Sequence, residues 1–261
     1  MRLGWAKMKL GKRLTQLVLQ INRHYDHIWD CCCDHGLLGA ALLKRCPNSV
    51  VHFVDIVPAL IEKVTLDLTR YFPATAALPR WRTHCMDVRD LPLDSHSGSH
   101  LLIIAGVGGD LMSEFIAALV ERYPHRSFDF LLCPVHHGYT LREQLMTLGA
   151  RLQQEQLVEE NRRIYELLNV QIHPPAVRGK EPKLPPLSLV GESIWQVDND
   201  EQKMIAQRYL TQLQQHYQRK AQGGDVSAQK CWQAYQPINI TCRGNFSDGN
   251  SSIGGEYEST Q

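Results

Sequence analysis

The first regular pattern in the chain is an amphipathic stretch over residues 12–24. Leu14, Leu17, Val18 and Ile21 recur every three or four residues, which places them on one side of a helix. The other side carries mainly basic and polar residues. The pattern therefore predicts an opening helix that packs its apolar face against the protein and turns its basic face to solvent.

Short apolar runs then alternate with helical patterns. The run at 101–105 is continuously apolar, as expected of a central parallel strand that is covered on both faces. Strands are predicted at residues 27–33, 50–54, 80–86, 101–105 and 128–133, and helices at 37–45, 58–71, 111–122 and 140–148. Strands that alternate with helices in this way indicate a parallel sheet with helices on both faces, because right-handed crossovers allow little else.

Two more strands are predicted at the end of this series. Residues 152–159 and 163–172 flank a polar turn and should form an antiparallel hairpin at one edge of the sheet. Dinucleotide dehydrogenases usually carry a sixth parallel strand, whereas the methyltransferase version of the fold ends with a reversed one. We therefore predict an α/β fold with a doubly wound, mostly parallel, seven-stranded Rossmann-like sheet of the class I methyltransferase type.

The composition changes after this domain. Residues 173–186 are rich in proline and lysine and should form a surface linker. Residues 200–222 place apolar and aromatic side chains at helical spacing, which predicts a C-terminal helical extension. Residues 223–261 are poor in aliphatic side chains and are expected to be disordered. The expected organisation is a domain over 1–173, a linker and extension over 174–222, and a tail.

Composition and charge limit the possible partners. The chain is 43% hydrophobic and 21% charged, which is ordinary for a globular protein. Its net charge of +1 provides no attraction of the whole molecule to nucleic acid or to an anionic membrane, so such binding would need a local basic patch. The first 25 residues contain no acid and six basic residues: Arg2, Lys7, Lys9, Lys12, Arg13 and Arg23. We expect Lys9, Lys12 and Arg13 to contact RNA phosphates, although a solvated helix face would have the same composition.

Targeting, membrane and metal signals are weak. Lysines interrupt the apolar residues near the N-terminus, and every apolar run is far shorter than the ~20 residues of a membrane-spanning helix, so we expect a cytoplasmic protein. The eight cysteines form no CxxC pair, which argues against a zinc ribbon or a disulfide framework. Metal binding by Cys31, Cys33 and His35, or by the adjacent His136 and His137, is a less favoured reading, and no metal is predicted.

Acidic side chains follow three successive strands. Asp30, Asp55 and Asp87 stand at the predicted carboxyl ends, where ligands bind in doubly wound sheets. Asp55 is suited to the hydroxyls of a ribose, and Asp87 to an amino group of adenine. Each acid could instead cap a helix. The first loop lacks a GxGxxG motif, which argues against a dinucleotide but not against S-adenosylmethionine, since that cofactor has no pyrophosphate.

These motifs together resemble the bacterial tRNA (adenine-N1)-methyltransferases that modify the D-arm region of tRNA. The resemblance covers about the first two thirds of the chain, in the same order. It rests on residues 30–36 (DCCCDHG), 103–111 (IIAGVGGDL), 131–134 (LLCP), 141–142 (LR), 156–160 (QLVEE) and 164–166 (IYE). The pair Asp34-His35 and the AGVGG run are its most specific parts. That family has a class I methyltransferase fold with a helical C-terminal extension.

The resemblance implies a set of site residues. Asp30, Cys32, Asp34 and His35 would surround the methionine part of S-adenosylmethionine, and Asp55 its ribose. Asp87 and Val88 would hold the adenine. Ala105 and Gly106 would complete the cofactor site, and Gly106, Val107, Gly108 and Gly109 would flank the target base. No catalytic side chain is assigned.

Two residues depart from the family pattern: Cys32 stands where glycine is common, and Val135 where a polar residue follows Pro134. A Cβ at position 32 restricts the approach of the cofactor or demands an ordinary φ.

Methylation of adenine N1 in tRNA is therefore the function that the sequence favours. The reaction needs positioning more than a strong base, and an adenine in a base pair would first have to be unpaired. Val135 and the modest net charge leave open a methyltransferase of the same fold that acts on another RNA or on a small molecule. Cys32 leaves open a non-catalytic RNA-binding protein. No membrane and no obligate protein partner are expected.

Overall fold

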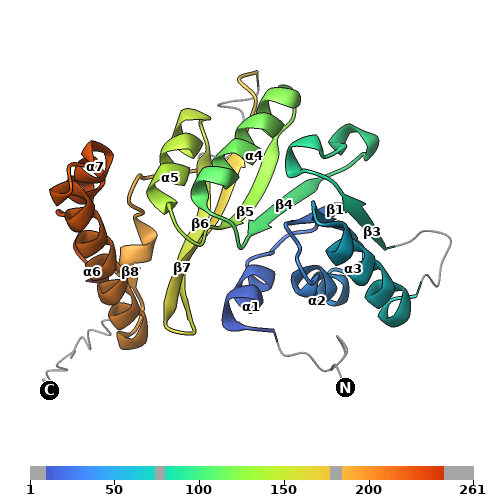
Figure 1. The fold of residues 1–261 in the computed structure, drawn as a ribbon, viewed down its shortest axis with the longest axis horizontal. Coiled ribbons are helices and arrows are strands. Elements are labelled where there is room, and N and C mark those ends of the chain that lie inside the picture. The colour runs from blue at the N-terminus through green and yellow to red at the C-terminus, as the bar shows by residue number, and fades with distance from the viewer. Residues whose placement is uncertain (1–9, 74–79, 177–183, 244–261) are drawn as a thin grey trace, which may run out of the picture.

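Seven strands form one twisted sheet at the centre of the protein (Figure 1). The computed structural model describes residues 10–73, 80–176 and 184–243. The strand order is β3-β2-β1-β4-β5-β7-β6. Strands β1 to β5 are parallel, and β7 runs antiparallel to β5 and to β6. The predicted fold is therefore confirmed.

The elements of this domain follow the predicted alternation. The strands are β1 (His27–Cys31), β2 (Val50–Asp55), β3 (Trp81–Cys85), β4 (His100–Ala105), β5 (Phe128–Cys133), β6 (Arg151–Glu160) and β7 (Arg163–Ile172). The helices are α1 (Lys12–Leu19), α2 (Leu37–Arg45), α3 (Pro58–Tyr71), α4 (Gly109–Arg122) and α5 (Gly138–Thr147). Two 3-10 turns, Val88–Asp90 and Leu93–Ser95, lie between β3 and β4. The opening helix ends at Leu19 rather than near His24, because the chain turns there before it enters β1.

Each face of the sheet buries its own apolar cluster. Helices α1, α2 and α3 cover one face through side chains such as Leu17, Leu42 and Val64. Helices α4 and α5 cover the other through Met112, Leu141 and their neighbours. Burial on both faces explains the continuous apolar runs at residues 101–105 of β4 and 130–133 of β5.

The last two strands form the predicted hairpin. Asn161 and Arg162 connect them, and both have positive φ angles, 51° and 63°. Two successive residues with positive φ are typical of the tight turn that matches the twist of paired strands. The hairpin reverses the chain at the edge of the sheet and brings β7 next to β5.

A C-terminal unit packs beyond this hairpin (Figure 1). It consists of a 3-10 turn (Ser193–Trp195), β8 (Gln196–Val197), α6 (Asp200–Gln222), α7 (Val226–Tyr235) and β9 (Thr241–Cys242). Asn199 caps α6 by accepting a hydrogen bond from the Gln202 backbone N–H at 2.9 Å. The predicted helix over 200–222 is present.

The expectation of a disordered tail from residue 223 is wrong for its first part. Helix α7 packs against α6, and Cys231 and Tyr235 bury their side chains in a small core with Trp195 and Ala206. This helix was not predicted because its aliphatic side chains are few: Val226, Ala228 and Ala234. Its buried side chains become a core only because α6 lies beside them. Residues 244–261 lie outside the described part. Among the described residues, no helix is both long and apolar enough to span a bilayer.

Candidate functional site

The carboxyl ends of β1, β2, β3 and β4 lie side by side, because these strands are parallel and adjacent in the sheet. Asp30 is the fourth residue of β1, and Asp55 is the last residue of β2. Asp87 follows β3 and begins the first 3-10 turn. The sheet order thus brings the three predicted acids to one edge, where doubly wound proteins bind their ligands.

The Cys32 thiol lies among these three acids. Burial and then the Asp55, Asp30 and Asp87 carboxylates, in that order, together raise the pKa of Cys32 to about 12. The sheet order, which places the ends of β1, β2 and β3 side by side, accounts for the proximity of the three acids to this thiol. A thiol with so high a pKa is not a nucleophile at neutral pH, since the thiolate is the reactive form.

The loop after β1 has the positive φ angles of a glycine-rich loop, although glycine occupies only one of the three positions. Cys32 and Asp34 have positive φ angles of 59° and 49°, and Gly36 has a φ of 69°. The substitution at position 32 has therefore not forced an ordinary φ. The strained residues are held partly by Asp55, whose Oδ2 accepts a hydrogen bond from the Asp34 backbone N–H at 3.0 Å.

The acids play different structural parts. Asp30 is 3% exposed, and its Oδ2 accepts a hydrogen bond from the Gly39 N–H of α2 at 2.8 Å. Burial raises the pKa of Asp30 to about 7. Asp30 therefore supports the loop from beneath, whereas Asp55 is half-buried at the edge of the sheet.

Helix and turn capping, the alternative reading of these acids, also applies. Asp55 Oδ1 accepts a hydrogen bond from the Val57 N–H at 3.0 Å at the start of α3. Asp87 caps its 3-10 turn through the Arg89 N–H at 2.8 Å and pairs with the Arg89 guanidinium at 2.7 Å. Each carboxylate retains free acceptor capacity beyond these bonds, because an ionised carboxylate accepts about four hydrogen bonds.

The other predicted cofactor residues differ in accessibility. Asp34 and His35 are exposed, with His35 Nε2 3.6 Å from Asp34 Oδ1. Val88 is only 3% exposed, and its side chain belongs to the core. Gly106 has a φ of 88°, and a Cβ added there would have no atom within 4 Å. The edge of the sheet is thus open at Gly106.

The loops after β4 and β5 are joined by backbone hydrogen bonds. Val135 N donates to Val107 O at 3.0 Å, and Gly109 N donates to His136 O at 2.9 Å. A Cβ at Gly109 would lie 2.2 Å from the His137 carbonyl oxygen, and one at Gly108 2.2 Å from the His136 ring. The two glycines therefore allow the loops to approach, which fixes the predicted base-flanking segment against the Pro134 loop.

A cavity of about 250 Å³ opens beside this pair of loops, between the residues after β5 and helix α6. Val135, 42% exposed, lies on its wall. Its other lining residues include His136, Ile164, Glu166, Tyr209, His216 and Tyr217. Sequence reasoning missed this cavity, since α6 is far away in the chain. The one available signal was Glu166, a charged residue among the apolar positions of β7.

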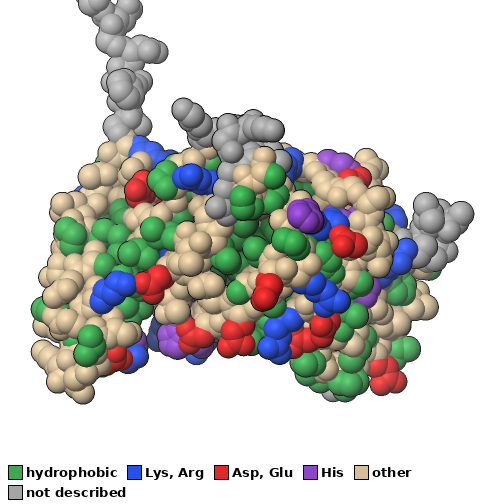
Figure 2. All heavy atoms as spheres, turned by 90° about the horizontal axis from the view of Figure 1, so that it is seen from above, with side chains coloured by type: hydrophobic (Ala, Val, Ile, Leu, Met, Phe, Trp, Pro, Cys, Tyr) green, Lys and Arg blue, Asp and Glu red, His purple; other side chains and the backbone are tan. Residues whose placement is uncertain are grey.

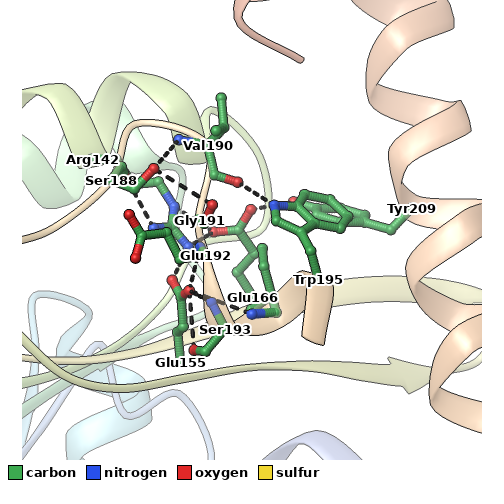
Figure 3. A network of polar contacts seen from close by, with 11 residues as sticks. Arg142, Glu155, Glu166, Ser188, Val190, Gly191, Glu192, Ser193, Trp195 and Tyr209 are labelled. Atoms are coloured by element: carbon green, nitrogen blue, oxygen red, sulfur yellow. Dashed lines mark hydrogen bonds and ion pairs between the residues drawn. The ribbon is translucent and has the colours of Figure 1, made fainter. Parts of the chain in front are cut away.

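A buried ion cluster holds the C-terminal unit next to this cavity (Figure 3). The Arg142 side chain is fully buried and pairs with Glu155 at 2.7 Å and Glu166 at 2.9 Å. Tyr209 of α6 donates to Glu166 at 2.8 Å, and the Glu192 and Ser193 N–H groups each donate to Glu155 at 2.7 Å. Three elements of the domain and two of the extension therefore meet in one network.

Two of the three residues predicted to contact RNA phosphates, Lys12 and Arg13, belong to the described part of the chain. Lys9 lies outside the described residues, and Lys12 is exposed. The Arg13 guanidinium lies over the Tyr165 ring, 5.2 Å from its centroid, and its Nη1 is 3.9 Å from Cys133 Sγ. Arg13 thus packs α1 against the sheet, and Lys12 is the described residue available to a phosphate.

A doubly wound sheet with a reversed last strand, and acids at the ends of its first three strands, defines the class I methyltransferase fold. Comparison with known families agrees: the chain belongs to the family described as a methyltransferase domain, whose model matches residues 10–168. The predicted class, an S-adenosylmethionine-dependent methyltransferase, is confirmed.

Solved structures share this fold at low sequence identity. An uncharacterised protein from Listeria monocytogenes matches with a TM-score of 0.67 and 14% identity over 87% of this chain and 98% of that chain. The M. capricolum protein TrmK, solved with S-adenosyl-homocysteine, matches at 0.65 and 14%, covering 87% and 95%. The B. subtilis M1A22 tRNA methyltransferase TrmK matches at 0.60 and 19%, covering 88% and 95%. The search of curated proteins found no match.

Proposed function

We propose that this methyltransferase transfers a methyl group from S-adenosylmethionine to N1 of an adenine in tRNA. The observation that carries the proposal is the convergence of Asp55 and Asp87 on the Cys32 loop, beside the joined loops after β4 and β5. The tRNA methyltransferase of B. subtilis, matched over 88% of this chain, supports the choice of substrate.

The residues present fit the cofactor. The loop of residues 32–36 keeps the positive φ angles that let backbone N–H groups face a carboxylate. Asp55 has acceptor capacity for the ribose hydroxyls, and Asp87 for the adenine amino group. Gly106 borders open space, as a position next to a bound sulfonium requires. Asp30 acts beneath the loop as a positioning residue.

When bound, S-adenosylmethionine supplies a methyl group on a positively charged sulfur, and its transfer to a ring nitrogen releases a neutral thioether, so no strong base is needed. The chain's own contribution is then alignment. Backbone hydrogen bonds from Val135 and Gly109 hold the base-flanking loop, and alignment of this kind can supply ~7–11 kcal/mol of the barrier. The cavity between the Pro134 loop and α6 provides room for an unpaired base or its neighbour.

The charge distribution makes tRNA binding local. On the face shown in Figure 2, described basic and acidic side chains are interspersed rather than separated. Several basic residues are paired, as Arg208 is with Glu159 at 2.6 Å and Lys230 with Glu143 through their side chains. We infer that shape, through the C-terminal unit and the cavity, contributes more to substrate choice than a broad basic surface does.

The test is incubation of the full chain with total tRNA and methyl-labelled S-adenosylmethionine, followed by nucleoside analysis. New N1-methyladenosine in the RNA supports the proposal. Label in another nucleoside, or only in small molecules, would mean that the enzyme methylates another substrate, as Val135 in the cavity wall allows. The absence of both cofactor binding by calorimetry and label would favour a non-catalytic RNA-binding protein.

Variants test the cofactor assignment. Asp55→Asn retains the size of the side chain but removes its charge, and we expect cofactor affinity to fall at least ~10-fold, as loss of a charge-assisted hydrogen bond does. Asp94→Asn is the matched control, since Asp94 is an exposed acid that pairs with Arg126 at 2.8 Å away from the crevice. Equal affinities in the two variants would remove Asp55 from the site.

A further inference from the structure

Five histidines gather with Trp29 on the α4 side of the sheet. They are His27, His52, His84, His96 and His100. His27 and His100 are the first residues of β1 and β4, so the cluster lies toward the amino-terminal ends of the strands. The candidate cofactor crevice is at the opposite ends. The methyltransferase reaction as described above makes no use of this cluster.

Three of these rings turn their nitrogens toward one another. The ligand nitrogens of His27, His52 and His96 all lie within 4.8 Å of one another. His27 Nδ1 and His52 Nε2 are 2.9 Å apart. Ligands at 2.0–2.1 Å from a tetrahedral ion are about 3.3 Å apart, a spacing that falls between the 2.9 Å of this pair and the 4.8 Å limit of the set.

The surrounding residues hold these rings in place. His52 Nδ1 lies 3.0 Å from His84 Nε2, and the His27 ring is hydrogen-bonded to the backbone of Ser97. Trp29 stacks on His52 with ring centroids 3.8 Å apart. Histidines that bind metals usually have the second ring nitrogen engaged in this way, because that bond fixes the tautomer and the ring orientation.

The His96 backbone is fixed from the other side. His100 Nε2 lies 3.0 Å from the His96 carbonyl oxygen, and His100 Nδ1 accepts a hydrogen bond from the Trp29 indole at 3.1 Å. His96 belongs to the connection between β3 and β4, whereas His27 and His52 belong to the sheet. An ion bound by all three would tie that connection to β1 and β2.

We propose that His27, His52 and His96 bind a divalent first-row transition-metal ion of the zinc type. Neutral imidazole suits such ions, and three histidines leave a fourth position open. His52 is buried, whereas His27 and His96 are half-exposed, so the ion can enter from solvent and a water can complete the set. The sequence predicted no metal because these residues are spread over 70 positions without a motif.

The experiment measures metal binding by the full chain without an affinity tag. Metal is removed with chelator, zinc chloride is added, excess is dialysed away, and bound zinc is counted by mass spectrometry. Cobalt(II) allows two further measurements. A tetrahedral cobalt site gives intense visible absorption, and bound cobalt should lower the fluorescence of the stacked Trp29. The wild type should bind one ion per chain.

Three variants decide the outcome. His96→Gln removes a half-exposed ligand and should weaken zinc binding at least ~10-fold. His52→Gln should do the same if it folds, and His96→Gln remains decisive if it does not. His125→Gln, at an exposed histidine outside the cluster, should bind like the wild type. The proposal fails if the wild type retains no zinc, or if His96→Gln and His125→Gln bind it equally. None of these readings depends on methyl transfer.

Discussion

Replacing Arg142 with methionine tests whether the buried ion cluster holds the C-terminal unit in place. The variant retains most of the volume of the side chain but leaves two carboxylates, Glu155 and Glu166, buried without their cation (Figure 3). Removal of one partner from a buried charge cluster costs roughly 3–5 kcal/mol. We expect the free energy of unfolding to fall by about this amount near neutral pH.

The stability lost in Arg142→Met should depend on pH, and the charges of the cluster determine the direction of that dependence. Burial alone would raise the pKa of Glu155, but Arg142 and the Glu192 and Ser193 N–H groups outweigh it and hold the pKa below its usual value. A lowered pKa stabilises the fold above the unfolded pKa and ceases to do so as the pH falls. Without Arg142, the effect of burial dominates and Glu155 takes up a proton more readily. The stability lost in the variant should therefore become smaller as the pH falls from about 8 to about 5.

Urea unfolding followed by circular dichroism measures the total loss, and hydrogen exchange locates it. Faster exchange should be concentrated in α6 and α7, because Tyr209 and the 188–194 segment lose their anchor. Arg208→Met is the matched control. Its ion pair with Glu159 is exposed, so its loss should stay below about 1 kcal/mol. A loss below about 1 kcal/mol for Arg142→Met, or one that does not vary with pH, would refute the reasoning.

Two further predictions concern the edge of the sheet. The pKa of Asp30 is raised to about 7, so the folded state favours the protonated carboxyl. The resulting contribution to stability is fully present below the pKa of Asp30 in the unfolded chain and is lost as the pH rises toward 7. The Asp30→Asn variant lacks this titration. Its free energy of unfolding relative to that of the wild type, measured in urea, should therefore rise by up to about 4 kcal/mol between about pH 4 and pH 8. A difference between the two proteins that does not change with pH would contradict this. Gly109→Ala places a Cβ against the His137 carbonyl and should lower stability by about 1–3 kcal/mol. Gly138→Ala, whose Cβ would have ordinary contacts of 3.7 Å with Glu166, should change it by less than about 1 kcal/mol in the same assay, and equal losses in both would exclude the steric explanation.

Much of the candidate cofactor site could be predicted from the sequence because it depends on local order. Asp55 ends β2 and Asp87 follows β3, and parallel strands end at the same edge, so their proximity follows from the topology alone. The effect of Cys32 could not be predicted in the same way. Its positive φ belongs to a loop that is held partly by the hydrogen bond from the Asp34 N–H to Asp55, which joins this loop to the end of β2.

The C-terminal unit, by contrast, depends mainly on tertiary contacts that the sequence does not reveal. The spacing of apolar residues predicted α6, but α7 was missed because it has few aliphatic side chains and its buried residues become a core only against α6. The partners of Arg142 were equally hidden. Its two glutamates lie 13 and 24 residues away along the chain and meet it only after the hairpin has formed.

The sequence by itself determined the alternation of strands and helices, the reversed edge and the acids at the strand ends, because each depends on side-chain periodicity and on neighbouring residues. The tertiary structure alone decided which distant polar groups meet: Arg142 with Glu155 and Glu166, and His27 with His52 and His96. The physical reason is register. Glu155, Glu166, His27 and His52 lie on strands, and a shift of one residue in a strand would turn its side chain to the other face, away from Arg142 or His96. No local pattern in the sequence records that alignment.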